Sequence, residues 1–460
     1  MRIKRNPALP WLVIALCVFL QACSANMAYS PLVKQSLEVQ NLEKALEDVE
    51  DIDQGRSLLL YLYEKGLLLH YANRYEESNA AFEKAEAVYD ELYTKSASRE
   101  AGALLTSDTV IKYRGEQFEA ALTHYYKILN YLYLEEPEGA LVECRKINHR
   151  LGVFAASGDS VYVDDPFLQY LTGMVFFDNG DLNNADVSFR KARSAFIELG
   201  EWYGVETPPS LACDLVKCSE ALGDIEAAER YREEAGDCEK RAIEGGKGAL
   251  NVFVESGFAP FKIEQNIVLP IYKDDYDGDF DTDEMAVVLV DRYGQPVNSS
   301  RKIDYMLRVA IPEMVSGPEP FMDAGVRVAN DSLTLRTRAA IVEDVEALAY
   351  EAFEARRGKI LLKTVTRALV KYLAKQGADS QSEIAGWIVN LFNVATESAD
   401  TRSWTTLPQT IRMARLALPE GTYTIELRLY GDYQEDDEIY TVDGVEIKSG
   451  RATFLNFRIN

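Results

Sequence analysis

The chain has 460 residues, and its 74 acidic residues outnumber 49 basic ones, which gives a formal net charge of −25 at pH 7. This charge excludes nucleic acid as a partner, because the phosphate backbone would be repelled. Hydrophobic residues make up 47% of the chain, so buried cores are expected, and the length predicts two or three domains.

The N-terminus predicts an exported protein with a lipid anchor. Residues 1–22 combine a basic start with an apolar run too short to span a bilayer, as in a secretory signal peptide. The segment ends in LQAC, which resembles a bacterial lipobox, so we expect cleavage before Cys23 and lipidation of that residue. Ser24 would follow it, which by resemblance to lipoprotein sorting favours the outer membrane, with residues 23–34 as linker. An ordinary signal peptide with an incidental cysteine is the alternative.

Residues 35–245 show helical spacing and internal repeats, which predict an all-α solenoid like the tetratricopeptide (TPR) repeat. The clearest unit covers residues 167–196. In it, Gly173 stands where two antiparallel helices approach closely, and Ala185, Phe189 and Ala192 of the second helix face the first helix. Gly66 and Phe82 occupy the corresponding places in another unit. A helical bundle without repeats is the alternative.

Alignment of the units predicts aromatic residues along the concave face of the solenoid. This set comprises Tyr63, His70, Tyr125, Tyr170 and Phe177. Tyrosine offers a large rigid surface and a hydroxyl group, so the set is a candidate peptide-binding groove. The alternative is that these rings pack against another part of the same chain.

The cysteines outside the signal segment leave the disulfide pattern open. They are Cys144, Cys213, Cys218 and Cys238. An oxidising compartment permits a disulfide among the last three, and two facing helices could bring Cys218 close to Cys238. A zinc site is less favoured, because none of the three histidines is near these cysteines in the sequence.

Residues 250–460 predict a β-sandwich-like domain, because the apolar period changes from helical to two. A helical insertion is expected at about 339–399. The fold class is therefore α+β in two parts, a TPR-like solenoid followed by this domain.

An acidic stretch lies between two predicted strands of the second part. Its alternating aspartates are Asp275, Asp277, Asp279, Asp281 and Asp283. An EF-hand is excluded, because positions six and twelve counted from Asp275 are Phe280 and Ala286, where glycine and glutamate are required. Two interpretations remain, a solvated loop and a different kind of calcium site. Calcium is the one cofactor that the sequence suggests.

Several phrases together resemble an uncharacterised family of bacterial lipoproteins with TPR-like repeats. They include YRGEQFEAALTHYYKILNYL, ESGFAPFKIEQNIVLPI and, as the most specific piece, ADTRSWTTLP. The resemblance implies a role in the cell envelope. In the last phrase, Asp400 and Arg402 are two residues apart, which predicts a turn in which Arg402 pairs with a carboxylate or a carbonyl. Trp404 would then fill the joint between helices and sandwich.

A basic strip recurs at a spacing of four in the predicted insertion. Its members are Lys359, Lys363, Arg367, Lys371 and Lys375. A preceding acidic helix suggests weak surface ion pairs between two helices. The functional alternative is a strip that contacts anionic lipid head groups or a cell-wall polymer such as peptidoglycan.

Catalytic motifs are scarce, so we do not expect an enzyme. The three histidines, His70, His124 and His149, all fall in predicted packing helices. No phosphate loop, nucleophile elbow or zinc helix is present in the sequence. The leading hypothesis is a non-enzymatic outer-membrane lipoprotein that faces the periplasm and binds an envelope protein in its TPR groove. The alternative is a cell-wall or carbohydrate-binding protein that acts through the β domain.

Overall fold

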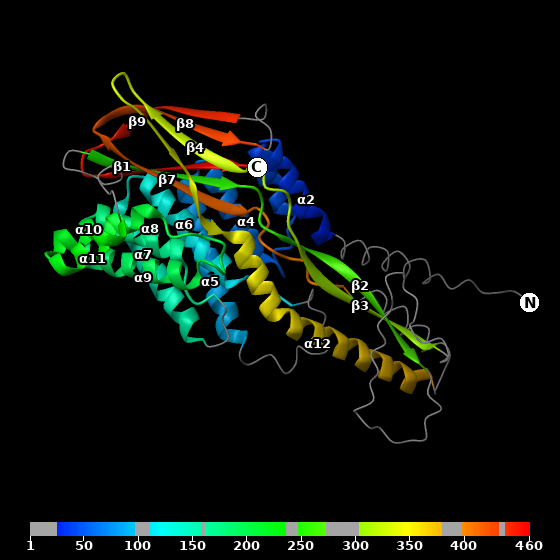
Figure 1. Ribbon diagram of the computed structural model, residues 1–460. Helices are drawn as coiled ribbons and strands as arrows, with labels where there is room; N and C mark the ends of the chain where they lie inside the picture. The colour runs from blue at the N-terminus through cyan, green and yellow to red at the C-terminus, as the bar shows by residue number, and fades with distance from the viewer. Residues whose placement is uncertain are drawn as a thin grey trace, which may run out of the picture.

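The computed structural model describes residues 25–96, 111–157, 162–235, 247–272, 303–379, 398–431 and 438–460. Two stacked β-sheets lie across a layer of paired helices, and a long helix and a two-stranded ribbon extend from one end of the body (Figure 1). The α+β fold class predicted from the sequence is confirmed.

The helical half consists of antiparallel helix pairs. A first segment contains α2 (Ala25–Glu38), α3 (Leu42–Asp48) and a 3-10 turn (Val49–Asp51). The pairs that follow are α4 (Leu58–Tyr71) with α5 (Tyr75–Ser96), α6 (Gln117–Tyr133) with α7 (Pro137–Ala156), α8 (Pro166–Asp178) with α9 (Leu182–Leu199), and α10 (Pro209–Leu222) with α11 (Ile225–Ala235). Each pair packs against the next, which confirms the predicted repeat of TPR-like helix pairs.

Glycine allows the helices of a pair to approach closely. A Cβ atom on Gly173 would lie 2.4 Å from Cδ1 of Phe189, and one on Gly66 would lie 2.7 Å from Cε1 of Phe82. Neither distance is compatible with a side chain, so both glycines are required by packing. Asp165 caps α8, since its carboxylate accepts a hydrogen bond from the Leu168 N–H.

The strands form two four-stranded sheets and one ribbon. Their bounds are β1 (Lys247–Ser256), β2 (Phe261–Tyr272), β3 (Ile303–Val315), β4 (Asp323–Ala329), β5 (Thr334–Arg338), β6 (Ala340–Asp344), β7 (Thr410–Pro419), β8 (Gly421–Tyr430), β9 (Glu438–Ile447) and β10 (Ala452–Ile459). The first sheet has the order β10-β1-β7-β6 and the second β5-β4-β8-β9, while β2 and β3 pair with each other. Within the first sheet, β1 is parallel to β10 and antiparallel to β7.

Strand β1 connects the two halves of the protein, because it is buried on both faces. Successive side chains of a strand point to opposite faces. Leu250, Val252 and Val254 belong to the core between the two sheets. Phe253, on the other face, joins the core of the helical half, with its ring 5.7 Å from that of Tyr125. The chain therefore folds as one body in which the first sheet covers the helices.

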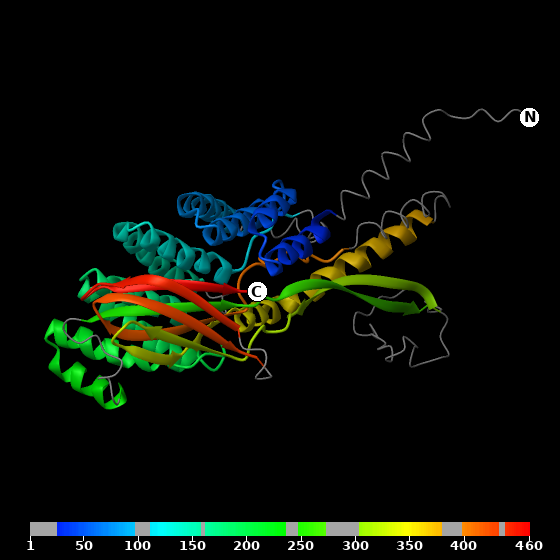
Figure 2. The same cartoon turned by 90° about the horizontal axis from the view of Figure 1, so that it is seen from above.

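The predicted helical insertion needs correction. Residues 340–344 form strand β6, which pairs with β7, and one long helix, α12 (Val345–Asp379), follows. The predicted acidic helix and the basic strip that follows it thus lie mainly on α12, and not on two facing helices. Helix α12 packs against β3 where both leave the body (Figures 1 and 2), so α12, β2 and β3 together are called the arm.

The cysteines also differ from one expectation. Cys213 is disulfide-bonded, whereas Cys144 and Cys218 are buried free thiols. The suggested pairing of Cys218 is therefore wrong. The partner of Cys213 lies outside the described residues.

None of the helices in the described ranges is long and apolar enough to cross a bilayer.

Candidate functional site

The concave face of the helical half is closed by the chain itself. Tyr63, Tyr125 and Tyr170 are at most 1% exposed, and His70 is 2% exposed. Phe177 is partly buried. The prediction of an open peptide-binding groove at these five positions is wrong, because the first sheet lies on the face that the groove would occupy. The alternative, packing against another part of the chain, describes the structure.

Glu255 of β1 is the polar centre of this contact. It is fully buried, and its carboxylate accepts hydrogen bonds from the hydroxyl groups of Tyr125 (2.8 Å) and Tyr71 (2.7 Å). Asn456 of β10 donates to the same carboxylate (3.2 Å) and to Nε2 of His70 (3.0 Å). The Tyr125 hydroxyl, which was expected to bind a partner, therefore binds the sheet.

The segment before β7 fills the joint between helices and sheet, as predicted. The Arg402 guanidinium pairs with Asp400 (2.7 Å) and donates to the carbonyl groups of Arg56 and Ile111. Trp404 is 1% exposed, and its ring stacks on Tyr63 at a centroid distance of 4.6 Å.

Two further polar clusters join the helices to the first sheet. Arg415 of β7 pairs with Asp214 of α10 and donates to the Tyr170 hydroxyl (3.0 Å). Near the start of α8, the buried carboxyl groups of Asp165 and Glu343 are hydrogen-bonded to each other. Burial raises the pKa of Asp165 to about 6 and raises that of Glu343 well above its ordinary value, so this pair retains a proton. The name seam is used below for all these contacts between the concave face and the first sheet.

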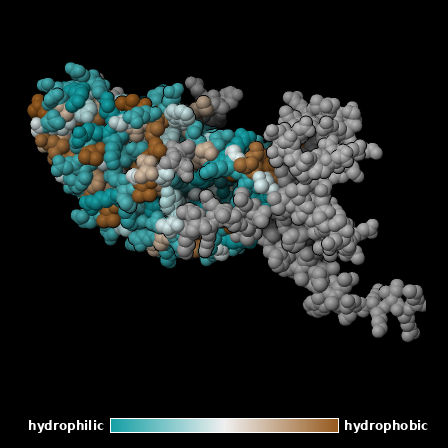
Figure 3. Space-filling view, turned by 90° about the horizontal axis from the view of Figure 1, so that it is seen from below, coloured by the Kyte–Doolittle hydropathy of each residue, from teal (hydrophilic) through white to brown (hydrophobic). Residues whose placement is uncertain are grey.

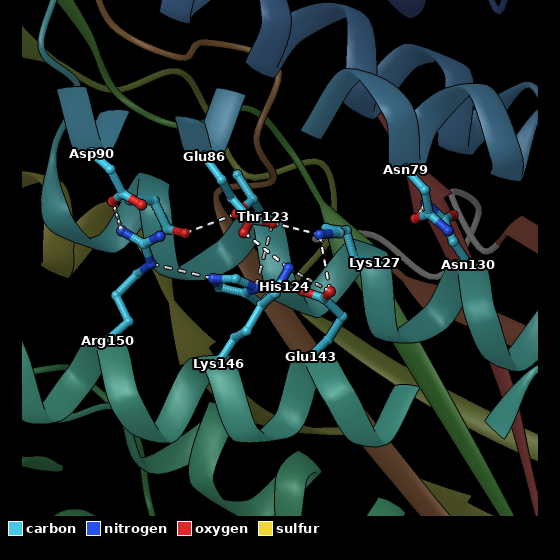
Figure 4. A network of polar contacts seen from close by, with 11 residues as sticks. Asn79, Glu86, Asp90, Thr123, His124, Lys127, Asn130, Glu143, Lys146 and Arg150 are labelled. Atoms are coloured by element: carbon cyan, nitrogen blue, oxygen red, sulfur yellow. Dashed lines mark hydrogen bonds and ion pairs between the residues drawn. The ribbon is translucent and has the colours of Figure 1, made fainter. Parts of the chain in front are cut away.

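A buried ion network joins α5, α6 and α7 on the other side of the helices (Figure 4). Lys127 is fully buried and pairs with Glu86 (2.5 Å) and Glu143 (3.0 Å), and Lys146 contacts both carboxylates. His124 lies against Glu143, with 2.7 Å between Nδ1 and Oε2. Glu143 keeps a pKa of about 2 despite burial, because His124 and the two lysines favour its charged form.

His70 and His124 are held as neutral rings. Arg150 donates to Nε2 of His124 and Asn456 donates to Nε2 of His70, so the proton of each ring lies on Nδ1. Burial lowers the pKa of both residues, which agrees with neutral imidazoles. Both nitrogens of each ring already have a partner, which makes either ring a poor general base.

Glu86, His124 and Glu143 are also close enough to suggest a metal site, since their ligand atoms lie within 4.8 Å of one another. The two lysine ammonium groups, however, already neutralise these carboxylates. A divalent cation would have to displace both, so this donor set fits a structural ion network better than a metal centre.

A basic pocket opens at the base of the arm, with a volume of about 620 Å³. Its walls come from the loop before α6, from β2 and β3, from α12 and from residues 398–402. Eight cationic side chains line it: Lys112, Arg114, Lys262, Arg356, Lys359, Lys363, Arg367 and Arg402. Among the described residues that line it, Glu116 and Asp400 are the acidic ones. In a protein of net charge −25, this is a strong local excess of positive charge.

The two carboxylates are both occupied by cations of the pocket. Glu116 pairs with Arg356 (2.6 Å) and lies 3.6 Å from Lys262, and Asp400 pairs with Arg402. Arg367 is 2% exposed, whereas Lys112, Arg114 and Lys359 are exposed to solvent. The pocket therefore offers a buried cationic floor with solvent-exposed lysine and arginine side chains at its rim, an arrangement that suits an anionic ligand.

The structure brings together part of the predicted basic strip. Lys359, Lys363 and Arg367 line the pocket. Lys371 and Lys375 lie on α12, but their side chains are outside the described residues. Sequence reasoning missed Lys112, Arg114 and Lys262, because nothing in the sequence shows that these distant segments meet at α12.

The other site predictions fall outside the described residues. Cys23 precedes α2, and Asp275, Asp277, Asp279, Asp281 and Asp283 follow β2. Lipidation and calcium binding therefore stay predictions.

Figure 3 shows a largely hydrophilic face on which hydrophobic residues are scattered and do not form one broad patch. This face offers no obvious apolar docking surface.

No protein-family model matches the chain, and neither does any curated protein sequence. Among solved structures it is similar to MamA, with 11% identity, a TM-score of 0.30, and 46% of this chain and 90% of that chain covered. A putative kinesin light chain of Podosopora anserina with TPR-like repeats gives 12% identity, a TM-score of 0.31, and coverage of 46% and 93%. Pseudomonas aeruginosa PilF has 15% identity and a TM-score of 0.22, with 46% of this chain and 90% of that chain covered. Similarities this loose carry no functional argument, and the function has to be inferred from the geometry of the chain itself.

Proposed function

We propose that this protein is a membrane-anchored, non-enzymatic binding protein of the bacterial cell envelope. Its basic pocket holds an anionic group of an envelope component, either a lipid head group or a cell-wall polymer. The observation that carries the proposal is the gathering of eight cations around one cavity of about 620 Å³ in a strongly acidic chain. The predicted signal segment and the lipidation of Cys23 support an outer-membrane location with the body in the periplasm.

The proposal of a non-enzymatic role rests on the state of the reactive side chains. His70 and His124 have both ring nitrogens engaged. Burial raises the pKa of the Cys218 thiol to about 12 and raises that of Cys144 further, so both thiols stay protonated at neutral pH. Neither thiol is therefore an activated nucleophile.

Binding of soluble anions tests the proposal. The mature chain, expressed without residues 1–22 and with Cys23→Ser, is titrated calorimetrically with inorganic pyrophosphate and with soluble peptidoglycan fragments. At least one of these probes should bind saturably. The double variant Lys359→Glu, Lys363→Glu should weaken binding at least about 10-fold, since each reversal replaces an attraction by a repulsion.

Charge-matched variants control for the net charge. Arg336→Glu with Arg338→Glu changes the charge by the same amount on exposed positions of β5, outside the pocket. Equal loss of binding in both double variants, or no binding of either probe to the unmodified pocket, would contradict the proposed function.

A second candidate function is a protein-interaction module that uses the outer surface of the helix pairs. Trp202 is 66% exposed just after α9, and Ile197 at the end of that helix is 60% exposed. Large exposed apolar residues of this kind are typical anchors of protein interfaces. If a partner binds there, Trp202→Ala should release it in crosslinking experiments on intact cells, and the pocket variant should not.

A further inference from the structure

The apolar lining of the basic pocket narrows the class of ligand. Beside its cations, the pocket is lined by Ala310 and Pro312 of β3 and by Phe353, Ile360 and Leu362 of α12. A site for a fully hydrated polymer would need few such contacts. The combination of cationic and apolar walls fits an amphiphile whose charged group binds the cations and whose chain lies against the apolar residues.

The rim continues the apolar surface beyond the pocket. Leu361 is 44% exposed and Leu362 is 70% exposed, and both stand between Lys359 and Lys363 on α12. Exposed leucine beside lysine is the pattern of a surface that lies at a lipid interface, where the apolar groups enter the acyl boundary and the cations stay at the head groups.

Helix α2, which follows the predicted anchor in the sequence, contacts the base of the arm. Helix α2 begins at Ala25, two residues after Cys23. Its Lys34 ammonium lies 4.8 Å from the ring centre of Phe258 and 5.6 Å from that of Phe261, the residue before Lys262. Nine residues of helix extend about 14 Å, so the first residue of α2, Ala25, lies about that far from Lys34.

The charge distribution of the chain favours one orientation of the protein on an anionic bilayer. The chain carries 74 acidic and 49 basic residues, so most of its surface is repelled by an anionic bilayer. The basic pocket is attracted instead, and the attraction acts over about a Debye length, roughly 8 Å at physiological salt.

From these observations we propose that the ligand is the phosphate head group of an anionic phospholipid in the same leaflet that carries the Cys23 anchor. This inference rests on the proposed function. It gives the arm a role: α12, β2 and β3 meet the membrane surface and hold the body in one orientation, with the first acyl carbons of the bound lipid against Leu361 and Leu362.

Vesicle binding tests the inference. The mature Cys23→Ser chain is mixed with phosphatidylglycerol–phosphatidylethanolamine vesicles or with phosphatidylcholine vesicles, and bound protein is measured by co-sedimentation. We expect binding to the anionic vesicles only. Lys359→Glu with Lys363→Glu should reduce it at least about 30-fold, given about tenfold per 1.4 kcal/mol and about 1 kcal/mol per basic residue, whereas Arg336→Glu with Arg338→Glu should stay close to the unmodified chain.

A second variant separates a lipid from a soluble anion. Leu361→Asn should weaken vesicle binding and leave pyrophosphate binding unchanged, because Leu361 is exposed, carries no charge and does not line the pocket. Circular dichroism melting confirms that each variant is folded.

The outcomes are distinguishable. Binding of soluble anions with no vesicle binding overturns the lipid inference and leaves the proposed function intact. Vesicle binding that the leucine variant does not change contradicts the apolar part of the site. Absence of binding to both kinds of probe overturns the inference together with the proposed function.

Discussion

The seam and the basic pocket differ in how their polar groups are satisfied. At the seam, Glu255 is fully buried and surrounded by donors from tyrosine and asparagine, so nothing is left for a ligand. Among the described residues that line the pocket, cations outnumber carboxylates eight to two around an open volume. A surface whose polar groups satisfy each other holds the fold together, whereas one with an excess of a single charge is suited to recognition.

The largest expected effect comes from the seam. Tyr125→Ala and Tyr170→Ala should each lower the free energy of unfolding by about 3–5 kcal/mol, as for other buried aromatic residues. Each substitution also removes a hydroxyl group that hydrogen-bonds to a buried carboxylate, of Glu255 or Asp214. Urea denaturation measures the change. Tyr93→Ala, at a tyrosine that is 41% exposed on α5, is the control and should cost much less. A nearly unchanged stability for Tyr125→Ala would mean that the ring lines an open groove.

A smaller effect tests the carboxyl pair of the seam. The pKa of both Asp165 and Glu343 is raised in the folded protein, chiefly by burial. Their contribution to stability is therefore fully present below the pKa of the unfolded chain and is lost as the pH rises through about 6, the folded pKa of Asp165. Glu343→Gln removes the part of this dependence that comes from Glu343. Between pH 5 and pH 8 the unmodified protein should lose more stability than the variant, by about 1.4 kcal/mol or more.

Denaturation curves at the two pH values provide the comparison. Glu354→Gln, at an exposed position of α12, is the matched control and should follow the unmodified protein. Parallel pH dependence in the protein and in Glu343→Gln would show that the pair does not share a proton.

The smallest effect on stability is expected at the pocket. Lys359→Glu with Lys363→Glu should change the free energy of unfolding by no more than about 0.5 kcal/mol, as is usual for surface positions. Thermal melting is sufficient to measure it. A loss as large as that of the tyrosine variants would place these lysines in the framework of the fold and remove the contrast with the seam.

The sequence predicted the local partners better than the distant ones. Gly173 and Phe189 lie sixteen positions apart in one helix pair, and their contact follows from helical spacing. The corner at Arg402 and Trp404 was also predictable, since its residue types allow few other roles. In contrast, the aromatic face of the solenoid was expected to be open. Its tyrosines have the same spacing whether they face a peptide or a sheet, and only the fold of β1 decides between the two.

For the same reason, only part of the basic pocket could be predicted from the sequence. Lys359, Lys363 and Arg367 recur along one helix, and their periodicity showed them. Lys112 and Lys262 come from a loop and a strand with no periodic relation to that helix, so their approach depends on how the arm leaves the body.

The most direct test of a lipid-binding pocket is lysine footprinting of the unmodified mature chain on anionic vesicles. Acetylation rates are compared, by mass spectrometry, with and without phosphatidylglycerol vesicles. Lys84 on α5 and Lys191 on α9 are exposed lysines away from the pocket and serve as references. We expect slower acetylation of Lys112, Lys359 and Lys363 on vesicles, with unchanged rates at the two references. Equal protection of all five lysines, or protection of the references alone, would contradict membrane binding through the pocket.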